Sequence, residues 1–302
     1  MANANLLRAA RIRCPVPSIA AAFFQRPRVS QYHGGQTPTQ EYRCGIDAEP
    51  LYRYRPGGYH PVTVGDSLSD GRYKILHKLG WGSYSTTWAA KDQLHDRYVA
   101  LKITVAEPKR SDEMEILEKL ADTPRNHPGS CYVNQMLDQL TVIGPNGSHD
   151  CLVLELVGPN VSDVIGSYCR DDRLPSRAAR SISKQVLQGL DYLASKGIGH
   201  GDLHTRNIAL EIPGLHSLSE RDFIARLGEP EMGLVIRQDG KPLSSKVPTH
   251  IVRPSSFRDK DVQSLLASPS TKIIDFGEAF FNLDAPNTLH TPLPMYGVQD
   301  VL

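Results

Sequence analysis

A single lysine inside an apolar strand constrains this chain more than any other feature of its sequence. Tyr98–Thr104 reads YVALKIT, a β-branched run typical of a buried strand, and Lys102 stands within it. Burying a lysine is costly unless an opposite charge pairs with it. The next segment, 111–121, has helical spacing and offers Glu113 as that partner, with Glu115 in reserve. The sequence therefore predicts an ion pair between a strand and a helix, unless the lysine reaches solvent from an edge strand.

A glycine-containing hairpin is predicted just before this strand. Leu79–Trp88 reads LGWGSYSTTW, with Gly80 and Gly82 between two β segments. Glycine permits positive φ and lets the backbone approach a phosphate with no Cβ in the way. Ser85 stands where the third glycine of a GxGxxG pattern would be. The motif is imperfect, and a hairpin of this kind can equally be a simple turn.

Two loops supply acidic and amide side chains. His200–Asn207 reads HGDLHTRN, in which Asp202 can accept a hydroxyl proton and the amide oxygen of Asn207 can bind Mg²⁺. Asp275 opens the triplet DFG, at the end of the apolar segment KIID, and offers a carboxylate for a metal that bridges phosphates. Either loop alone could be an ordinary surface loop. Together with the hairpin and the lysine, in this order, they indicate phosphoryl-transfer chemistry.

The arrangement of predicted elements indicates an α+β chain with two lobes. A helix is expected over 176–196, with Gly197 ending it. Residues 211–269 are rich in Gly, Pro and Ser and are expected to be an insertion with one short helix near 220–227. The predicted strands are Val62–Val64, Tyr73–Leu76, Tyr98–Thr104, Cys151–Val157 and Thr271–Asp275.

The order GxGxxS, VALK, HxDxxxxN, DFG resembles the motif set of the eukaryotic protein kinases. Within that set, the stretches GGYHPVTVGD and RYKILHKLGWGSYSTTW resemble the SR-protein kinases and their fungal relatives, which phosphorylate serine or threonine. The resemblance covers about residues 51–294, and this family also tolerates an insertion between the catalytic loop and DFG. It implies a protein-kinase-like fold with a complete N-lobe and hinge at 51–157 and an incomplete C-lobe at 158–302.

The resemblance also implies cofactors, partners and roles for single residues. ATP and Mg²⁺ would be the cofactors, and the substrate would be a protein with serine or threonine, Arg-Ser-rich in this family. Lys102 would hold the α- and β-phosphates, Glu113 would pair with it, and Asp202 would act as base, while Asn207 and Asp275 would bind magnesium. The implied nucleotide-binding positions are Gly80, Trp81, Gly82, Ser83, Ser85, Ala100, Lys102, the gatekeeper Leu154, and Glu155 and Val157 of the hinge.

Two residues of the catalytic loop depart from the usual pattern. Gly201 replaces an arginine that pairs with a phosphorylated activation loop, which argues against control of that kind. His204 replaces a lysine that reaches the γ-phosphate, and a histidine carries only part of a charge at neutral pH. Three functions therefore stay open: an active Ser/Thr kinase, a nucleotide-binding pseudokinase or scaffold, and a small-molecule phosphotransferase, whose catalytic loop also reads HGDLH.

The ends of the chain carry separate expectations. Residues 1–50 are expected to be a leader outside the fold, because five arginines and no acid precede Glu41. That composition favours a mitochondrial presequence or a disordered tail, whereas the resemblance points to cytoplasm and nucleus. After DFG the chain reads EAFFNLDAPNTLHTPLPMYGVQDVL, without the further helices that the resemblance leads us to expect. We therefore expect a truncated C-lobe and a partly uncovered apolar stripe on the helix at 176–196.

Composition excludes several other classes. The formal net charge of +1 gives no reason to expect direct nucleic-acid binding. No apolar run reaches the length of a membrane span. The five cysteines have no CxxC spacing, so neither a zinc site nor a disulfide framework is predicted. Oligomeric state does not follow from the sequence.

Overall fold

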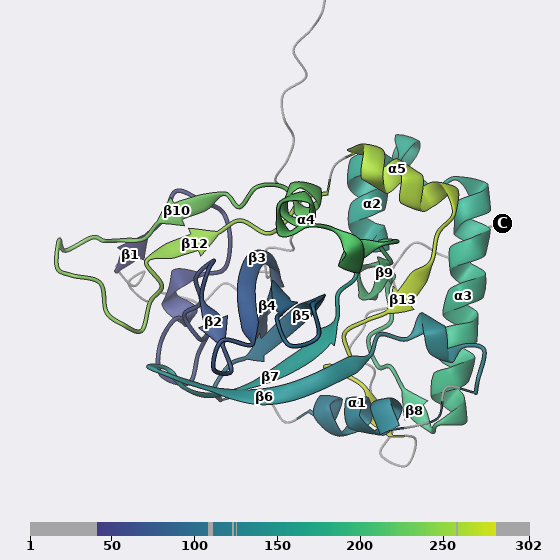
Figure 1. The fold of residues 1–302 in the computed structure, drawn as a ribbon, viewed down its shortest axis with the longest axis horizontal. Coiled ribbons are helices and arrows are strands. Elements are labelled where there is room, and N and C mark those ends of the chain that lie inside the picture. Colours follow the sequence, from purple (N-terminus) through teal and green to yellow (C-terminus); the bar gives the residue numbers. More distant parts are fainter. Residues whose placement is uncertain (1–40, 108–110, 123, 125, 258, 282–302) are drawn as a thin grey trace, which may run out of the picture. The chain divides into compact units, whose positions relative to one another are not determined.

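The computed structural model describes residues 41–107, 111–122, 124, 126–257 and 259–281 (Figure 1). Residues 1–40 and 282–302 lie outside this range, and with them most of the expected leader and the segment after DFG. Residues 41–50 were assigned to the leader, and the structure corrects this. Strand β1 (Tyr42–Arg43) pairs with β11 (Ile236–Arg237), and the side chain of Glu49 is buried.

An antiparallel sheet of six strands, in the order β2-β3-β4-β5-β7-β6, forms the first half of the fold. Lys102 lies on β5, between β4 and β7, so the alternative of an edge-strand lysine is wrong. The residues on either side of Lys102 in β5 are buried, because both faces of a central strand are covered. The bounds are β2 (Ser67–Leu68), β3 (Tyr73–Trp81), β4 (Ser85–Asp92), β5 (Arg97–Thr104), β6 (Met136–Gly144) and β7 (Gly147–Glu155).

The predicted strand at Val62–Val64 is not formed, although Val62 is buried in the core of the sheet. Gly65, with φ +96°, turns the chain, and its N–H bonds to the carbonyl of Ile75 at 2.9 Å. A short apolar run therefore packs here as a loop, and pairing begins only at β2.

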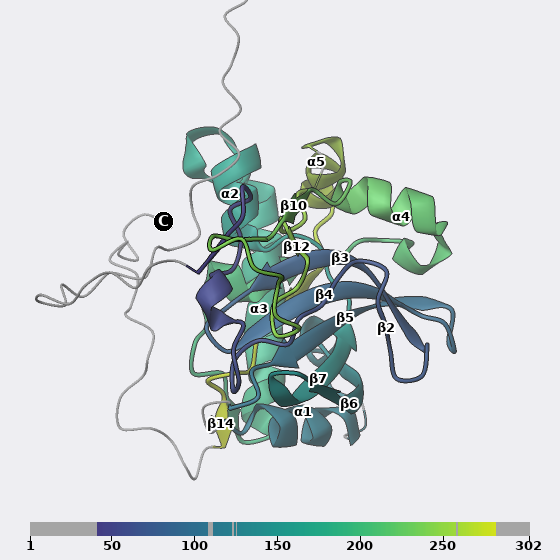
Figure 2. The same ribbon diagram turned by 90° about the vertical axis from the view of Figure 1, so that its left-hand side faces the viewer.

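Helix α1 (Glu113–Asp122) packs one apolar face against a second hydrophobic cluster, which contains Ile116, Leu117 and Phe276. Both views place it beside β6 and β7 (Figures 1 and 2). Three further helices follow the sheet: α2 (Val161–Tyr168), α3 (Ser176–Ser195) and α5 (Asp259–Ala267). Helices α2 and α5 share one hydrophobic cluster, which contains Val164 and Val262. Short 3₁₀ turns occur at Leu51–Arg53, Ser130–Tyr132, Arg170–Asp172, Thr205–Asn207 and Leu215–Ser217.

The helix predicted at 176–196 is α3, and the chain turns at Gly197, whose φ is +68°. Ile182 and Leu193 of its apolar stripe are buried. Leu187 of the same stripe is 66% exposed in the part of the chain that the structure describes. Two short pairs of strands then position the loops that follow α3. They are β8 (Ile198–Gly199) with β14 (Phe280–Phe281), and β9 (Ile208–Leu210) with β13 (Thr271–Ile273).

The insertion at 211–269 contains the predicted helix, α4 (Glu220–Leu227), but also structure that was not predicted. Strands β10 (Met232–Leu234) and β12 (His250–Val252) pair with each other, and α5 closes the segment. Phe223 of α4 stacks on Tyr98 of β5 with ring centroids 3.9 Å apart. The expectation of a loop with one helix is therefore wrong, because the insertion packs its own apolar side chains onto the sheet.

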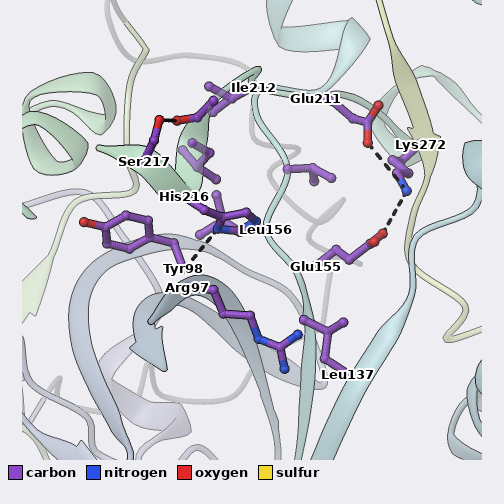
Figure 3. Close-up of a pocket in the computed structure, with 13 residues that line it drawn as sticks. Arg97, Tyr98, Leu137, Glu155, Leu156, Glu211, Ile212, His216, Ser217 and Lys272 are labelled. Carbon is purple, nitrogen blue, oxygen red and sulfur yellow. Dashed lines mark hydrogen bonds and ion pairs between the residues drawn. The ribbon is translucent and has the colours of Figure 1, made fainter. Parts of the chain in front are cut away.

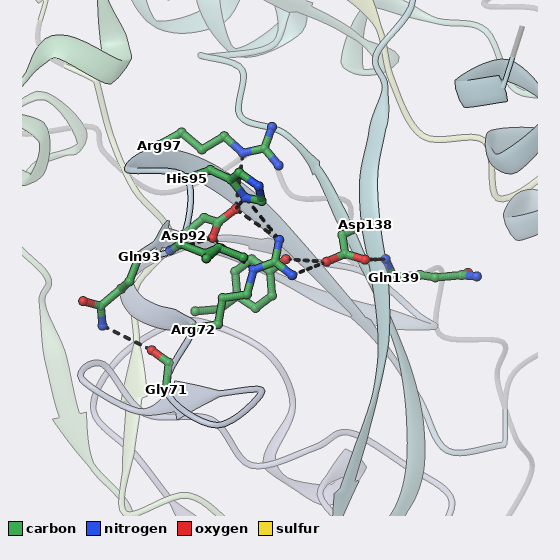
Figure 4. A network of polar contacts seen from close by, with 10 residues as sticks. Gly71, Arg72, Asp92, Gln93, His95, Arg97, Asp138 and Gln139 are labelled. Carbon is green, nitrogen blue, oxygen red and sulfur yellow. Dashed lines mark hydrogen bonds and ion pairs between the residues drawn. The ribbon is translucent and has the colours of Figure 1, made fainter.

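A network of polar contacts joins the strands of the sheet around Asp92 (Figure 4). The side chain of Asp92 is fully buried and contacts Arg72 at 3.1 Å, His95 at 2.9 Å and Arg97 at 3.3 Å. Arg72 also reaches Asp138 on β6 at 2.6 Å. Burial favours the neutral acid, but the hydrogen bonds from Arg72 and His95 outweigh it and lower the pKa of Asp92. The network thus joins β4, β5 and β6 by paired charges.

Candidate active site

Lys102 lies at the centre of a three-residue charge cluster. Its Nζ is 2.6 Å from a carboxylate oxygen of Glu113 and 2.8 Å from one of Asp275. Burial opposes the charge on Lys102, but the attraction of Asp275 and Glu113 outweighs it and raises the pKa of the ammonium. The attraction of Lys102 in turn lowers the pKa of Asp275. The cation expected to meet phosphates is therefore fixed in place and fully charged.

The start of α1 positions the carboxylate partner. Glu113 is the first residue of the helix and is buried, whereas Glu115 is exposed, so the reserve candidate is not the partner. The hydroxyl of Ser111 accepts from the N–H of Glu113 at 3.2 Å and donates to the carbonyl of Gly277 at 3.0 Å. The helix start and the DFG segment are thus joined at Ser111.

The DFG segment turns sharply after β13. Asp275 has φ +62°, a conformation that non-glycine residues rarely adopt, and this ends the predicted strand two residues early, at Ile273. Phe276 is 2% exposed and packs among side chains of α1, while the Asp275 side chain is 52% exposed. The buried ring and the turn together direct the Asp275 carboxylate toward Lys102.

The catalytic-loop candidates lie next to one another. The amide nitrogen of Asn207 donates to the carbonyl of Asp202 at 2.8 Å and approaches its carboxylate at 3.3 Å. The Nε2 atom of His204 is 3.5 Å from the Asp202 carboxylate, and its Nδ1 accepts from the N–H of Arg206 at 3.2 Å. The N–H of Ile274 donates to the carbonyl of Asn207 at 2.9 Å, which ties this loop to the residue before Asp275.

Gly201 is required by the backbone of this loop. Its φ is +77°, and a Cβ at this position would lie 2.0 Å from the carbonyl oxygen of Glu278. An arginine at position 201 would need a different path for one of the two segments. Gly201 thus replaces the usual arginine at a point where the catalytic loop lies close to the residues after DFG.

The glycine hairpin forms, and one of the two properties expected of its glycines is absent. Gly80 and Trp81 belong to β3, Gly82 and Ser83 form the turn, and Ser85 begins β4. Neither Gly80 nor Gly82 has positive φ, so the expectation of a special backbone conformation is wrong. A Cβ at either glycine would meet no atom within 4 Å. The two glycines instead leave open space beside the hairpin, as a loop that covers a ligand requires.

The residues expected around adenine occupy the next two strands. Ala100 on β5 lies opposite Leu154 on β7, and Val99 lies opposite Glu155, where β7 ends. The Glu155 carboxylate binds Lys272 at 2.9 Å, so the expected contact with adenine falls to the backbone of the hinge. Val157 follows two residues after the end of β7.

A separate cavity of about 440 Å³ borders the side chains of the hinge (Figure 3). Glu155, Leu156 and Val157 line it together with residues 211–212, residues 214–217 and Lys272. Lys102, Glu113, Asp202, Asn207 and Asp275 do not line it. We place the candidate active site at the charge cluster and not in this cavity, because the chemistry requires the lysine and the two loops.

The residues present fit a magnesium site that is completed by phosphate. Asn207 commits its amide nitrogen to Asp202, so its oxygen is the atom it offers to a metal, and the Asp275 carboxylate is half-exposed. Among the described residues, no group of three or more His, Cys, Asp or Glu side chains could hold a metal alone. Mg²⁺ is usually held by one or two protein oxygens plus substrate phosphates. Asn207 and Asp275 match that donor set.

Comparison with known proteins agrees with this geometry. Residues 73–219 match the protein kinase domain family. The chain is 38% identical over 172 residues to the serine/threonine-protein kinase SKY1 of Saccharomyces cerevisiae, covering 54% of this chain and 23% of that protein. It is 40% identical to protein kinase dsk1 of Schizosaccharomyces pombe, covering 52% and 30%, and 39% identical to human SRSF protein kinase 3, covering 52% and 28%.

A crystal structure of a kinase domain shares the fold, with a TM-score of 0.50 and 21% identity over 76% of this chain and 57% of that one. The chain thus carries a protein kinase domain with the predicted kinase-like fold. In sequence the chain is similar to relatives that are named as a serine/threonine-protein kinase and an SRSF protein kinase. It spans 23% to 30% of the length of the three curated relatives described above.

Some contacts around the site were missed at the sequence level. Tyr59 and Arg53 bond to the glycine hairpin, and Lys272 bonds to the hinge residue Glu155. His200 is buried, with its Nε2 3.1 Å from the carbonyl oxygen of Ile274. The pair Gly57–Gly58 next to Tyr59 was a usable signal, because adjacent glycines often mark a close backbone approach.

Proposed function

We propose that the chain is an ATP- and Mg²⁺-dependent kinase that transfers the γ-phosphoryl group to serine or threonine of a protein, with Arg-Ser-rich sequences as the substrate class. The observation that supports this most directly is the placement of Lys102 Nζ within 2.8 Å of Asp275 and 2.6 Å of Glu113. A strand, a helix and the DFG loop converge there on one cation, whose side chain is 14% exposed. In phosphoryl transfer the protein contributes mainly positioning and neutralisation of charge.

Each side chain then has a defined task. Lys102, held by Glu113, would bind phosphate oxygens, and Asp202 would accept the proton of the substrate hydroxyl. Asn207 and Asp275 would hold Mg²⁺, which when bound neutralises charge on the phosphates. Asn207 also orients Asp202 through its bond to the Asp202 carbonyl. The hairpin from Gly80 to Ser85 would cover the phosphates with the free N–H groups of its backbone; the N–H of Gly82 is bonded to the carbonyl of Ser85 at 2.9 Å.

A second candidate is a nucleotide-binding pseudokinase, and one observation favours it. His204, at the position of the usual lysine, lies 3.5 Å from the Asp202 carboxylate and not beside the Lys102 cluster. A histidine that pairs with the base leaves the transferred phosphoryl group with less positive charge. The small-molecule phosphotransferase is less well supported, since the curated relatives described above are named as protein kinases.

The test separates nucleotide binding from transfer. We expect ATP with Mg²⁺ to raise the melting temperature of the chain, and Lys102→Met to abolish that rise. We expect Asp202→Asn to keep the rise but to lower γ-phosphate transfer to an Arg-Ser peptide about 10²-fold or more. Lys241→Met, at a side chain that is 71% exposed, is the control and should change neither value. Binding without transfer in the unmodified chain would favour the pseudokinase, and no binding at all would refute both.

A further inference from the structure

The segment before the sheet holds the tip of the glycine hairpin from outside. The hydroxyl of Tyr59 donates to the carbonyl of Gly82 at 2.5 Å, and the guanidinium of Arg53 donates to the carbonyl of Ser83. Arg53 also lies over the Tyr59 ring, 5.0 Å from its centroid. Two consecutive carbonyls at the tip of the hairpin thus have donors from residues that are distant in sequence.

These donors are themselves firmly held. Tyr59 is 2% exposed, and its ring meets Tyr54 edge to face at 5.6 Å. Its carbonyl accepts from the side chain of Asn146, in the β6–β7 turn, at 2.6 Å. Burial raises the pKa of the Tyr59 phenol to about 12, so the hydroxyl keeps its proton and remains a donor. The Tyr59 side chain that donates to Gly82 is therefore held by packing and hydrogen bonds on several sides.

Two glycines make this approach possible. Gly57 has φ +78°, and a Cβ on Gly58 would lie 2.0 Å from the carbonyl oxygen of Arg53. The carbonyls of Gly57 and Gly58 accept from the N–H groups of Glu107 and Ala106, at 3.0 and 3.2 Å. The GGY sequence thus turns the chain tightly enough to bring Arg53 and Tyr59 to the same face.

The bonds to the carbonyls of Gly82 and Ser83 also set the orientation of the two peptide groups that contain these carbonyls. In a trans peptide the C=O and the following N–H point in opposite directions. With the carbonyls of Gly82 and Ser83 turned toward Tyr59 and Arg53, the N–H groups of Ser83 and Tyr84 point to the opposite side. Backbone N–H groups presented together in this way form an anion-binding surface.

We propose that Arg53 and Tyr59, together called the loop clamp, are positioning residues that fix the glycine hairpin in the orientation that binds nucleotide phosphates. This rests on the proposed function, since the phosphates are those of ATP. The clamp lowers the freedom that the hairpin must lose on binding, which is how preorganisation raises affinity. It acts through the backbone of Gly82 and Ser83 and does not touch the nucleotide.

The test uses Trp81, which adjoins the tip of the hairpin and is half-buried. The chain has two tryptophans, and Trp88 is 1% exposed, so quenching by acrylamide reports mainly on Trp81. Tyr59→Phe keeps the ring but removes the donor. We expect it to increase quenching of Trp81 and to weaken binding of Mg²⁺-ATP about three- to tenfold, the range of one hydrogen bond. KM for ATP should rise by the same factor while KM for the peptide stays unchanged.

Tyr54→Phe is the matched control, because Tyr54 is also buried but donates to Glu49 and not to the hairpin. It should leave Trp81 quenching unchanged. Equal quenching in Tyr59→Phe and the unmodified chain, or an equal increase in both variants, would overturn the proposal. Should Tyr59→Phe fail to fold, Arg53→Met decides by the same measurement. If the unmodified chain binds no nucleotide, the proposed function fails, while the quenching result still tests the clamp.

Discussion

Two histidines outside the candidate active site pack together, His149 on β7 and His60 in the segment before β2. The rings of His60 and His149 meet edge to face with centroids 5.0 Å apart, and His60 packs against Gly144, where a Cβ would lie 2.3 Å from the ring. Burial lowers the pKa of His60 from 6.5 to about 4, and repulsion from His149 adds to the effect. Burial also lowers the pKa of His149. Protonating either ring in the folded state is therefore unfavourable.

This pair predicts an acid-sensitive fold. The pKa of His60 is lower in the folded state, so the unfolded chain binds more protons between pH 6.5 and about 4. The contribution to the free energy of unfolding is fully present above pH 6.5 and is lost as the pH falls through this range. The loss is at most about 1.4 kcal/mol for each unit by which the two pKa values differ. His60→Gln should flatten the decline, as measured by urea unfolding at pH 7, 6, 5 and 4. Parallel curves for His60→Gln and the unmodified chain would contradict the assignment.

Single residues were predictable where a local pattern carried the chemistry. An apolar strand with one lysine, followed by a helix with an acid in its first turn, was enough to anticipate the contact between Lys102 and Glu113. The contacts of Tyr59 with Gly82 and of Lys272 with Glu155 could not be foreseen, because they join residues that no local pattern relates. The catalytic roles themselves stay predictions until the variants are assayed.

At the scale of elements, the insertion shows what sequence patterns detect. Helix α4 forms at the predicted residues: the Ser219 hydroxyl caps it, accepting from the N–H of Asp222 at 3.1 Å, and Phe223 and Leu227 share one buried face. Strands β10 and β12 have three residues each, too few for alternation to be recognised. Helix α5 was missed because the surrounding Gly, Pro and Ser residues masked its short apolar pattern.

The stacking of α4 on the sheet leads to a stability prediction. Phe223 is fully buried against Tyr98, with ring planes 3° apart, so Phe223→Ala leaves a cavity beneath the helix. We expect the free energy of unfolding to fall by about 3–5 kcal/mol, the usual range for this substitution in a core. Arg221→Ala on the exposed face of α4 is the control, with a change within about 0.5 kcal/mol. Urea unfolding measures both. Similar small losses in the two variants would show that the insertion is a peripheral loop after all.

At the scale of the whole described chain, one lysine joins segments that are far apart in sequence. Lys272 on β13 contacts Glu155 at the end of β7 at 2.9 Å and Glu211, just after β9, at 3.5 Å. Its side chain is 7% exposed, and the three residues line the cavity beside the hinge. The sheet, the start of the insertion and the strand before DFG are therefore tied by a single cation. The order of motifs predicted the fold class, but it contained no sign of this connection.

Removing that cation should destabilise the fold as a whole. Lys272→Met keeps the length of the side chain but removes the cation from two carboxylates, of which Glu211 keeps the hydrogen bond from the Ser270 hydroxyl. Breaking a buried ion pair in this way costs about 3–5 kcal/mol. Because the Glu155 and Glu211 side chains are 27% and 37% exposed, solvent reduces the loss, and we expect about 2 kcal/mol. The measurement is urea unfolding followed by tryptophan fluorescence, to which the buried Trp88 of the sheet contributes.

A double-mutant cycle then separates charge from packing. If the loss in Lys272→Met comes from the uncompensated carboxylates, adding Glu155→Gln should recover about 1 kcal/mol, because one of the two negative charges is removed. If the loss comes instead from the packing of the lysine stem, the second substitution recovers nothing and the two effects add. Recovery would establish that the hinge and the strand before DFG are coupled by charge. A change in the charge of Glu155 would then alter the electrostatic environment of Lys272, three residues before Asp275 in the candidate active site.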